Sequence, residues 1–127
     1  MPKRLNKNTS ITLAKTVMRL LGYWDISRTT QCSLLGISLT NSNRLRAMEA
    51  GTTGIPRGRD SHERVINLLA IHKHLSMLYP YNPEIKYGWV NMRNAKLDGR
   101  TPMEVMMGEG FVGISKIRNF LNMSYQR

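Results

Sequence analysis

One stretch, residues 61–78, restricts the fold more than any other part of the sequence, because its apolar residues recur at helical spacing throughout. Further apolar residues on both sides of this stripe make it wider than the single apolar face of a surface helix. We therefore expect a long helix that lies at the centre of the fold or in a dimer interface. The stripe consists of Val65, Leu68, Leu69, His72 and Leu75.

Capping residues and helix breakers divide the rest of the chain into shorter helices, and no strand pattern of any length competes with them. Gly22, Gly36 and Gly51 are each expected at or just after a helix end. The predicted fold class is therefore all-α. Besides the long helix, the predicted helices cover residues 11–21, 28–35, 39–50, 83–92, 102–108 and 111–125. The expected N-caps are Thr9 or Ser10, Ser27, Ser38, Asp60 with Glu63, Asn82, and Thr101 with Glu104.

The segment 52–59 is predicted to be a linker, because it is rich in glycine and threonine, contains Pro56 and has no helical pattern. It divides the chain into residues 1–58 and residues 59–127. We predict one helical part on each side of it. The loop of residues 93–100, with its Asp98-Gly99 turn pair, is the other long interruption.

The cysteine content and the start of the chain favour a cytoplasmic protein. Cys32 is a lone cysteine, so no internal disulfide is expected. No apolar run approaches the ~20 residues that a membrane span needs. The basic, polar start is followed by no apolar stretch of the kind found in signal peptides.

The chain is strongly basic, with 19 lysines and arginines against eight acidic residues and a net charge of +11. Residues 1–60 contain ten bases and three acids, and residues 61–127 contain nine and five, so the two parts carry +7 and +4. A positive field of this size attracts polyanions, and phosphate contacts dominate nucleic-acid affinity. The alternatives are a charge surplus that serves solubility and a ribosome-like basic protein. The N-terminal excess favours a localised anion-binding surface.

No catalytic or metal-binding group of residues stands out. The acidic residues are scattered, and most fall at predicted helix caps. His72 and His74 are two positions apart, so they point to different sides of a helix, unlike the i, i+4 pairs of zinc sites. We predict that the protein is not an enzyme and that it has no cofactor and no metal.

Residues 27–50 have the dimensions of a helix-turn-helix motif. The motif needs a small residue inside its first helix, which Cys32 supplies, and a glycine with positive φ at the turn, which Gly36 supplies. Ser42 stands where an apolar residue is usual. A short helical hairpin without a DNA function is the alternative. The expected anchors are Leu35, Ile37 and Leu45, and Leu39 and Met48 are expected in the core.

If the motif binds DNA, its second helix enters the major groove with its first residues at the base edges. Asparagine suits a bidentate contact with adenine, and arginine reads guanine or binds phosphate. The start of the preceding helix is placed for backbone phosphates. For the arginines of the second helix, a solvated surface position is the alternative. The predicted DNA-binding residues are Arg28, Thr29, Thr30, Thr40, Asn41, Asn43, Arg44 and Arg46.

Two groups of residues resemble the Xre/MbcA/ParS antitoxin family, over about residues 11–125 in all. The family's Xre-like helix-turn-helix half is similar to Trp24, to the run Thr30-Gln-Cys-Ser-Leu-Leu-Gly-Ile-Ser38, to Arg44-Leu-Arg46 and to Gly51. Its toxin-binding domain is similar to Arg64-Val-Ile-Asn-Leu-Leu-Ala-Ile-His72, to Asn82-Pro-Glu84, to Gly88-Trp89, to Asp98-Gly-Arg-Thr-Pro-Met-Glu-Val-Met106 and to Gly108-Glu-Gly-Phe-Val112. The chain departs from the family at Arg93-Asn94, where Pro-Asn is usual, and at Asn43 and Leu45, where a tryptophan or tyrosine is common.

The resemblance implies an antitoxin that binds a RES-domain toxin, a class that consumes NAD⁺ or ADP-ribosylates a target, and that represses its own promoter. It also implies a homodimer within a hetero-oligomeric complex, in which the C-terminal region covers the toxin's active-site entrance. Arg127 and its carboxylate would occupy the space of a charged dinucleotide there; a frayed terminus is the alternative. The toxin-binding residues implied are Trp89, Arg93, Asn94, Arg100, Met103, Met106, Met107, Glu109, Tyr125 and Arg127.

Two other functions fit the same sequence. One is a stand-alone helix-turn-helix transcription regulator whose C-terminal half only dimerises. The other is an adaptor that uses this half to bind another protein and never contacts DNA.

Overall fold

The computed structural model describes residues 6–125, except for the side chain of Tyr125, and this part of the chain is all-α, as predicted. The α-helices are α1 (Lys7–Tyr23), α2 (Arg28–Leu35), α3 (Asn43–Ala50), α4 (Arg59–Leu78), α5 (Pro83–Gly88) and α6 (Pro102–Tyr125). Three short 3-10 helices lie between them, η1 (Leu39–Asn41), η2 (Trp89–Asn91) and η3 (Ala95–Leu97).

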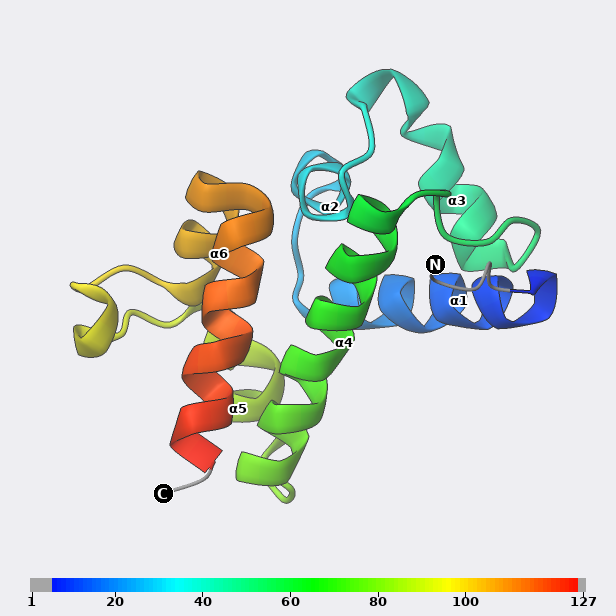
Figure 1. Ribbon diagram of the computed structural model, residues 1–127. Coiled ribbons are helices and arrows are strands. Elements are labelled where there is room, and N and C mark those ends of the chain that lie inside the picture. The colour runs from blue at the N-terminus through cyan, green and yellow to red at the C-terminus, as the bar shows by residue number, and fades with distance from the viewer. Residues whose placement is uncertain (1–5, 126–127) are drawn as a thin grey trace.

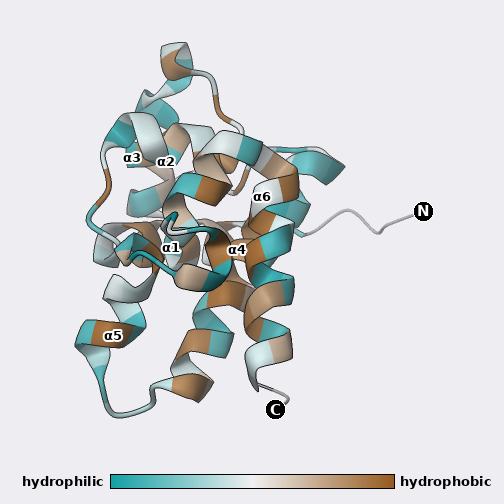
Figure 2. Cartoon of the chain, turned by 90° about the vertical axis from the view of Figure 1, so that its left-hand side faces the viewer, coloured by the Kyte–Doolittle hydropathy of each residue, from teal (hydrophilic) through white to brown (hydrophobic). Residues whose placement is uncertain are grey.

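Helix α4 lies at the centre of the arrangement, as its wide apolar stripe predicts. It contacts α1, α2, α5 and α6, and it runs side by side with α6 in the same direction (Figure 1). Helix α1 lies across the molecule beneath α3 and supports it. Figure 2 shows hydrophobic and hydrophilic residues alternating along α4 and α6, which buries one face of each helix and exposes the other.

The buried apolar side chains form one cluster that includes residues from Ala14 to Leu121. This cluster extends across the predicted boundary at residue 58. The predicted linker contributes to it, because Ile55 is only 6% exposed and its backbone N–H donates to Ser10 Oγ (3.0 Å). Residues 52–58 contain no helix and connect α3 to α4, and this contact holds the segment against α1. The division into two parts stays a prediction.

The first helix begins earlier than its apolar pattern indicates. Its N-cap is Asn6, whose side chain accepts a hydrogen bond from Thr9 N (2.8 Å), so the predicted caps Thr9 and Ser10 are wrong. The first turn of α1 is polar and exposed, so it leaves no apolar signal. The helix also continues through Gly22 to Tyr23.

The start of α4 is not capped as predicted. The N-cap is Gly58, with φ 112°, and it makes no side-chain capping bond. Asp60 instead accepts a hydrogen bond from Arg64 Nε (2.8 Å), and Glu63 accepts one from Arg59 Nε (3.0 Å). Both carboxylates are used in i, i+4 ion pairs, which is why the capping box does not form.

Other local predictions are confirmed. The side chains of Ser27, Ser38 and Asn82 each cap the helix that they precede. Gly36 and Gly51 adopt left-handed backbone conformations, with φ 71° and 77°, where their helices end. Two predicted helices are shorter than expected: residues 39–50 divide into η1 and α3, and residues 83–92 divide into α5 and η2.

The capping box at the start of α6 is confirmed in both directions. Thr101 N donates to Glu104 Oε1 (2.8 Å), and Glu104 N donates to Thr101 Oγ1 (3.0 Å). The Thr101 backbone hydrogen bond is the main cause that holds the pKa of Glu104 below its usual value. The break between the two predicted C-terminal helices lies at Gly110 (φ 61°, ψ −133°), two positions after the predicted end at Gly108.

Candidate nucleic-acid interface and partner surface

The side chains that the sequence identified as anchors belong to the shared core, to which α2 and α3 both contribute. Leu35 and Leu45 are fully buried, and Cys32 is 1% exposed. Burial raises the pKa of the Cys32 thiol, so this side chain stays protonated and serves packing. Ile37 and Ser42 are partly buried. The predicted small residue and glycine turn lie where the sequence placed them, and the assignment of residues 27–50 as a helix-turn-helix stays a prediction.

A polar contact that the sequence analysis missed also connects α2 and α3. Arg28, the first residue of α2, donates through Nη1 to Oε1 of the buried Gln31 (2.9 Å) and pairs through Nη2 with Glu49 near the end of α3. The charge of Arg28 is thus already compensated by a carboxylate. An arginine that already pairs with a carboxylate attracts a DNA phosphate less strongly. In the structure Arg28 connects the start of α2 with the end of α3.

The other predicted DNA contacts lie mostly on the surface, on the projecting corner that η1 and α3 form at the upper right of Figure 1. Arg44 is partly buried, and its Nε has no hydrogen-bond partner among the residues that the structure describes. Thr30 is also partly buried, and its hydroxyl accepts a hydrogen bond from Ser27 Oγ (3.0 Å). The exposed members of the predicted set are Thr29, Thr40, Asn41, Asn43 and Arg46.

Two further features define this corner. No acidic residue occurs between Asp25 and Glu49, so the exposed side chains of η1 and early α3 project from an acid-free segment. Leu39 is 58% exposed, which contradicts its predicted place in the core, whereas Met48 is fully buried as predicted. An exposed leucine beside asparagine and arginine matches the mixture of apolar and polar contacts used at base edges. We call the accessible side chains of residues 39–46 the α3 corner.

The C-terminal residues implied to bind a toxin fall into two groups. Trp89, Met103 and Met106 pack in the core, at 9%, 8% and 1% exposure, so the prediction that they form a contact surface is wrong for this structure. The Trp89 ring packs against Phe120 with 6.0 Å between ring centroids. Met107 stays exposed.

The loop before α6 is held by hydrogen bonds between its own residues. Arg93 Nη1 donates to Gly99 O (3.0 Å), and Asn94 N donates to Arg100 O (3.0 Å). Arg100 also pairs with Glu109 (3.3 Å), which a second cation, Lys116, contacts from the other side. The hydrogen bond from Lys116 is the largest cause that lowers the pKa of Glu109. The structure therefore brings four predicted residues together: Arg93, Asn94, Arg100 and Glu109.

The end of the predicted partner surface is not described. The side chain of Tyr125 and all of Arg127 lie outside the described residues. The proposed insertion of Arg127 into a dinucleotide site therefore stays a prediction.

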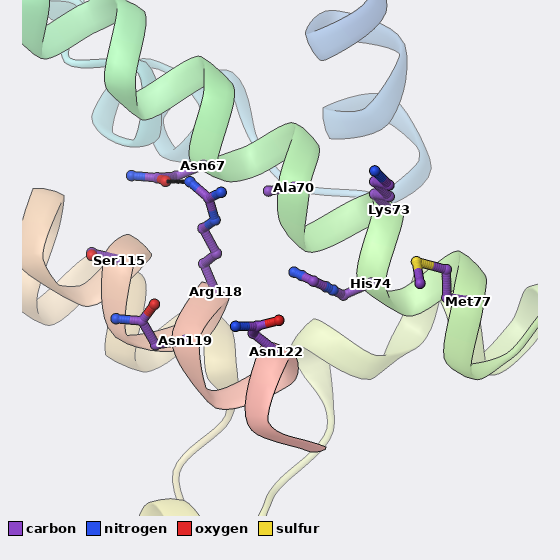
Figure 3. Close-up of a pocket in the computed structure, with 9 residues that line it drawn as sticks. All are labelled: Asn67, Ala70, Lys73, His74, Met77, Ser115, Arg118, Asn119 and Asn122. Atoms are coloured by element: carbon purple, nitrogen blue, oxygen red, sulfur yellow. Dashed lines mark hydrogen bonds between the residues drawn. The ribbon is translucent and has the colours of Figure 1, made fainter. Parts of the chain in front are cut away.

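A groove of about 470 Å³ between α4 and α6 was not anticipated (Figure 3). In it Arg118 extends from α6 towards α4 and donates to Asn67 Oδ1 (2.6 Å). His74 also lines the groove, and its Nδ1 is buried without a partner in the described part of the chain. The sequence carried no specific signal for it, because its polar residues on α4, Asn67, Lys73 and His74, are interspersed with Ala70 and Met77.

Two histidines in the second half of α4, His72 and His74, carry a lowered pKa. Burial is the largest cause for each; Lys86 adds to it for His72, and Arg118 and Lys73 add to it for His74. The unfolded chain therefore binds protons at a higher pH than the folded chain. The stability that these groups contribute is complete above the ordinary pKa of 6.5 and is lost as the pH falls through the lowered folded values.

We accordingly expect the urea midpoint of unfolding to fall as the pH is lowered from about 7 to about 5. The double variant His72→Gln/His74→Gln is expected to flatten this dependence, because the side chains that gain protons on unfolding are gone. Urea titrations at several pH values measure both. A double variant that keeps the full slope of the unmodified chain would assign the dependence to other groups.

No family model, curated protein or solved structure matches this chain. Within residues 6–125, no group of three or more histidine, cysteine, aspartate or glutamate side chains is placed to hold a metal ion. None of the described helices is both long enough and apolar enough to cross a membrane.

Proposed function

We propose that this protein is a DNA-binding repressor that also binds a partner protein, in the manner of an antitoxin that neutralises a RES-domain toxin in the cytoplasm. The observation that carries the DNA-binding part is the α3 corner. There, an acid-free run of exposed threonine, asparagine and arginine follows a left-handed glycine turn, and the helices before and after it bury Leu35 and Leu45 in the core. The +11 charge supports the same function, because it favours approach to a polyanion.

The partner-binding part is supported by the resemblance of residues 64–112 to a toxin-binding domain and by the form of the loop before α6. The two arginines of the loop, Arg93 and Arg100, donate to backbone carbonyls, and Arg100 also pairs with Glu109, so these contacts exist before any partner binds. Preorganised side chains lose less entropy on binding. The support for partner binding by this loop therefore comes from its hydrogen-bonded arginines. Trp89 and Met106 add none, because both are buried.

The arginines of α3 supply a direct test of DNA binding. We expect Arg44→Ala with Arg46→Ala to weaken binding to duplex DNA from the gene's own promoter about tenfold or more at ~100 mM salt, and to reduce the salt slope by about two. Lys96→Ala is the matched control, because η3 lies on the other side of the molecule from α3 (Figure 1). Anisotropy titrations at several salt concentrations measure both quantities. Equal losses for both variants would remove α3 from the interface.

Co-expression tests the function as a whole. Expressed with a neighbouring gene that encodes a RES-type protein, the chain is expected to restore growth and to be co-purified with that protein. Promoter binding without rescue would identify a stand-alone regulator. Co-purification without promoter binding would identify an adaptor.

A further inference from the structure

The groove between α4 and α6 is a second basic surface, and it is separate from the α3 corner. It lies along the later turns of the two helices, whereas α3 contacts α1 (Figures 1 and 3). Lys73 and Arg118 line the groove, and no acidic side chain of the described residues does. Amide and imidazole groups supply most of the remaining lining, from Asn67, His74, Asn119 and Asn122.

Several hydrogen-bond donors in the groove have no acceptor among the described residues. Arg118 donates to Asn67 Oδ1 (2.6 Å), and no other hydrogen bond of Arg118 occurs within residues 6–125. Lys73 forms no ion pair with any residue that the structure describes. His74 Nδ1 is buried and has no partner in the same part of the chain. A ligand that presents several oxygen acceptors would satisfy these groups, and buried polar groups are costly when they stay unsatisfied.

Exposed apolar side chains accompany the polar ones. On α4, Ile66 and Met77 are 37% and 39% exposed and share the helix face of Lys73. On α6, Val112 and Met123 are 57% and 64% exposed and share the face of Asn119. Met77 lines the groove, whose centre is cationic and amide-rich, and Ile66, Val112 and Met123 are exposed on the same two helices outside its lining.

We propose that this groove binds an acidic amphipathic helix of a partner protein, with carboxylates at Arg118 and Lys73 and apolar side chains over Ile66, Met77, Val112 and Met123. Helices commonly bind in grooves of this kind through anchors three or four residues apart. Carboxylates complement the unpaired cations, and the amides of Asn119 and Asn122 add donors for further oxygens.

Other occupants fit less well. Small-molecule sites are mostly apolar and enclose most of the ligand, whereas this groove is open and polar. A second copy of the chain would bring another +11 charge against a lining without a carboxylate from the described residues. Single-stranded nucleic acid is held by aromatic stacking, and no phenylalanine, tyrosine or tryptophan of the described residues lines the groove.

This groove extends the proposed binding of a partner protein, and it depends on that proposal only because it too needs a protein partner. The test uses a synthetic peptide and no toxin. Peptide binding can therefore fail while growth rescue succeeds, and growth rescue can fail while peptide binding succeeds. The probe is a fluorescein-labelled helical peptide with glutamate at every fourth position and leucines on the adjoining face. The control probe has glutamine in place of each glutamate.

Titrated with the full chain at ~100 mM salt, the acidic peptide is expected to bind saturably and at least tenfold more tightly than the glutamine peptide. Arg118→Gln and Lys73→Gln are each expected to weaken binding about fivefold. Arg19→Gln, which removes an exposed cation from α1, should leave it unchanged. Circular dichroism shows whether each variant is folded, and the exposed Lys73 keeps the test valid if Arg118→Gln unfolds.

A second readout follows the groove directly. A carboxylate near His74 should raise the pKa of that imidazole, and its ring protons, followed by NMR, should therefore titrate at higher pH with the acidic peptide bound. Equal binding of both peptides, or wild-type affinity in Lys73→Gln, would overturn the proposal. So would duplex DNA that displaces the peptide and shifts the His74 resonances, which would assign the groove to nucleic acid.

Discussion

Gly113→Ala is expected to lower the free energy of unfolding by about 3 kcal/mol, although it adds a single methyl group. Gly113 is buried in α6, and a Cβ atom at this position would lie 2.3 Å from Val105 O and 3.0 Å from Val105 C. The neighbour is backbone, so no side-chain rotation relieves the clash. The close approach exists because Gly110 (φ 61°, ψ −133°) breaks the helix and folds its first segment back against the second.

Gly108→Ala provides the matched control in the same helix. A Cβ atom at Gly108 would meet nothing within 4 Å, so the substitution gains helix propensity without a clash. It is expected to raise stability by about 0.5–1 kcal/mol. Urea denaturation followed by circular dichroism measures both variants. Similar values for the two would show that the approach of Val105 to Gly113 does not limit stability.

Arg64→Ala is expected to cost about 2–3 kcal/mol, because this side chain connects three helices. Its Nη1 donates to Ser33 O (3.2 Å) and Leu34 O (3.4 Å), carbonyls at the end of α2, where the last turn of a helix lacks internal partners. Its Nε pairs with Asp60 (2.8 Å). Its guanidinium carbon also lies 5.8 Å from the centre of the Phe111 ring in α6. The side chain is 15% exposed, so water replaces these contacts poorly.

Arg59→Ala is the control for charge alone. Arg59 forms an i, i+4 pair with Glu63 on the same helix, but its side chain is 81% exposed. Its loss should change stability by no more than about 0.5 kcal/mol. The loss of stability in Arg64→Lys is expected to lie between those of the two alanine variants. Lysine keeps the positive charge, but its single ammonium group cannot reach Asp60 and the two carbonyls of α2 together. If the two alanine variants lose equal stability, the contacts of Arg64 with α2 and α6 contribute nothing measurable.

Several features of the candidate sites could be predicted because their signals are local. The Thr101–Glu104 capping box and the glycine turn at Gly36 involve residues within a few positions of each other, so their geometry follows from backbone chemistry. At the α3 corner the core position predicted for Leu39 was wrong, and the role of its residues in DNA binding stays a prediction. The capping box at Asp60 and Glu63 was wrong because cations one turn away compete for both carboxylates.

The remaining features depend on residues far apart in the sequence. Arg28 meets Glu49 across 21 positions, and Arg118 meets Asn67 across 51. The burial of Met106 and the exposure of Leu39 depend on which neighbour each helix face receives. A helical period predicts that a face exists, but it does not identify the element that covers it.

The sequence alone determined that the chain is helical, where most helices begin and end, and that its charge favours an anionic partner. Propensity, capping and net charge are properties of short segments or of the whole composition, so they need no knowledge of packing. Tertiary structure decided which side chains stay accessible: it buried Trp89 and Met106, compensated Arg28, and left a groove without acidic side chains from the described residues between α4 and α6. The reason is physical, since accessibility depends on the pairing of helices distant in sequence, and that pairing is set by the shape of the shared core.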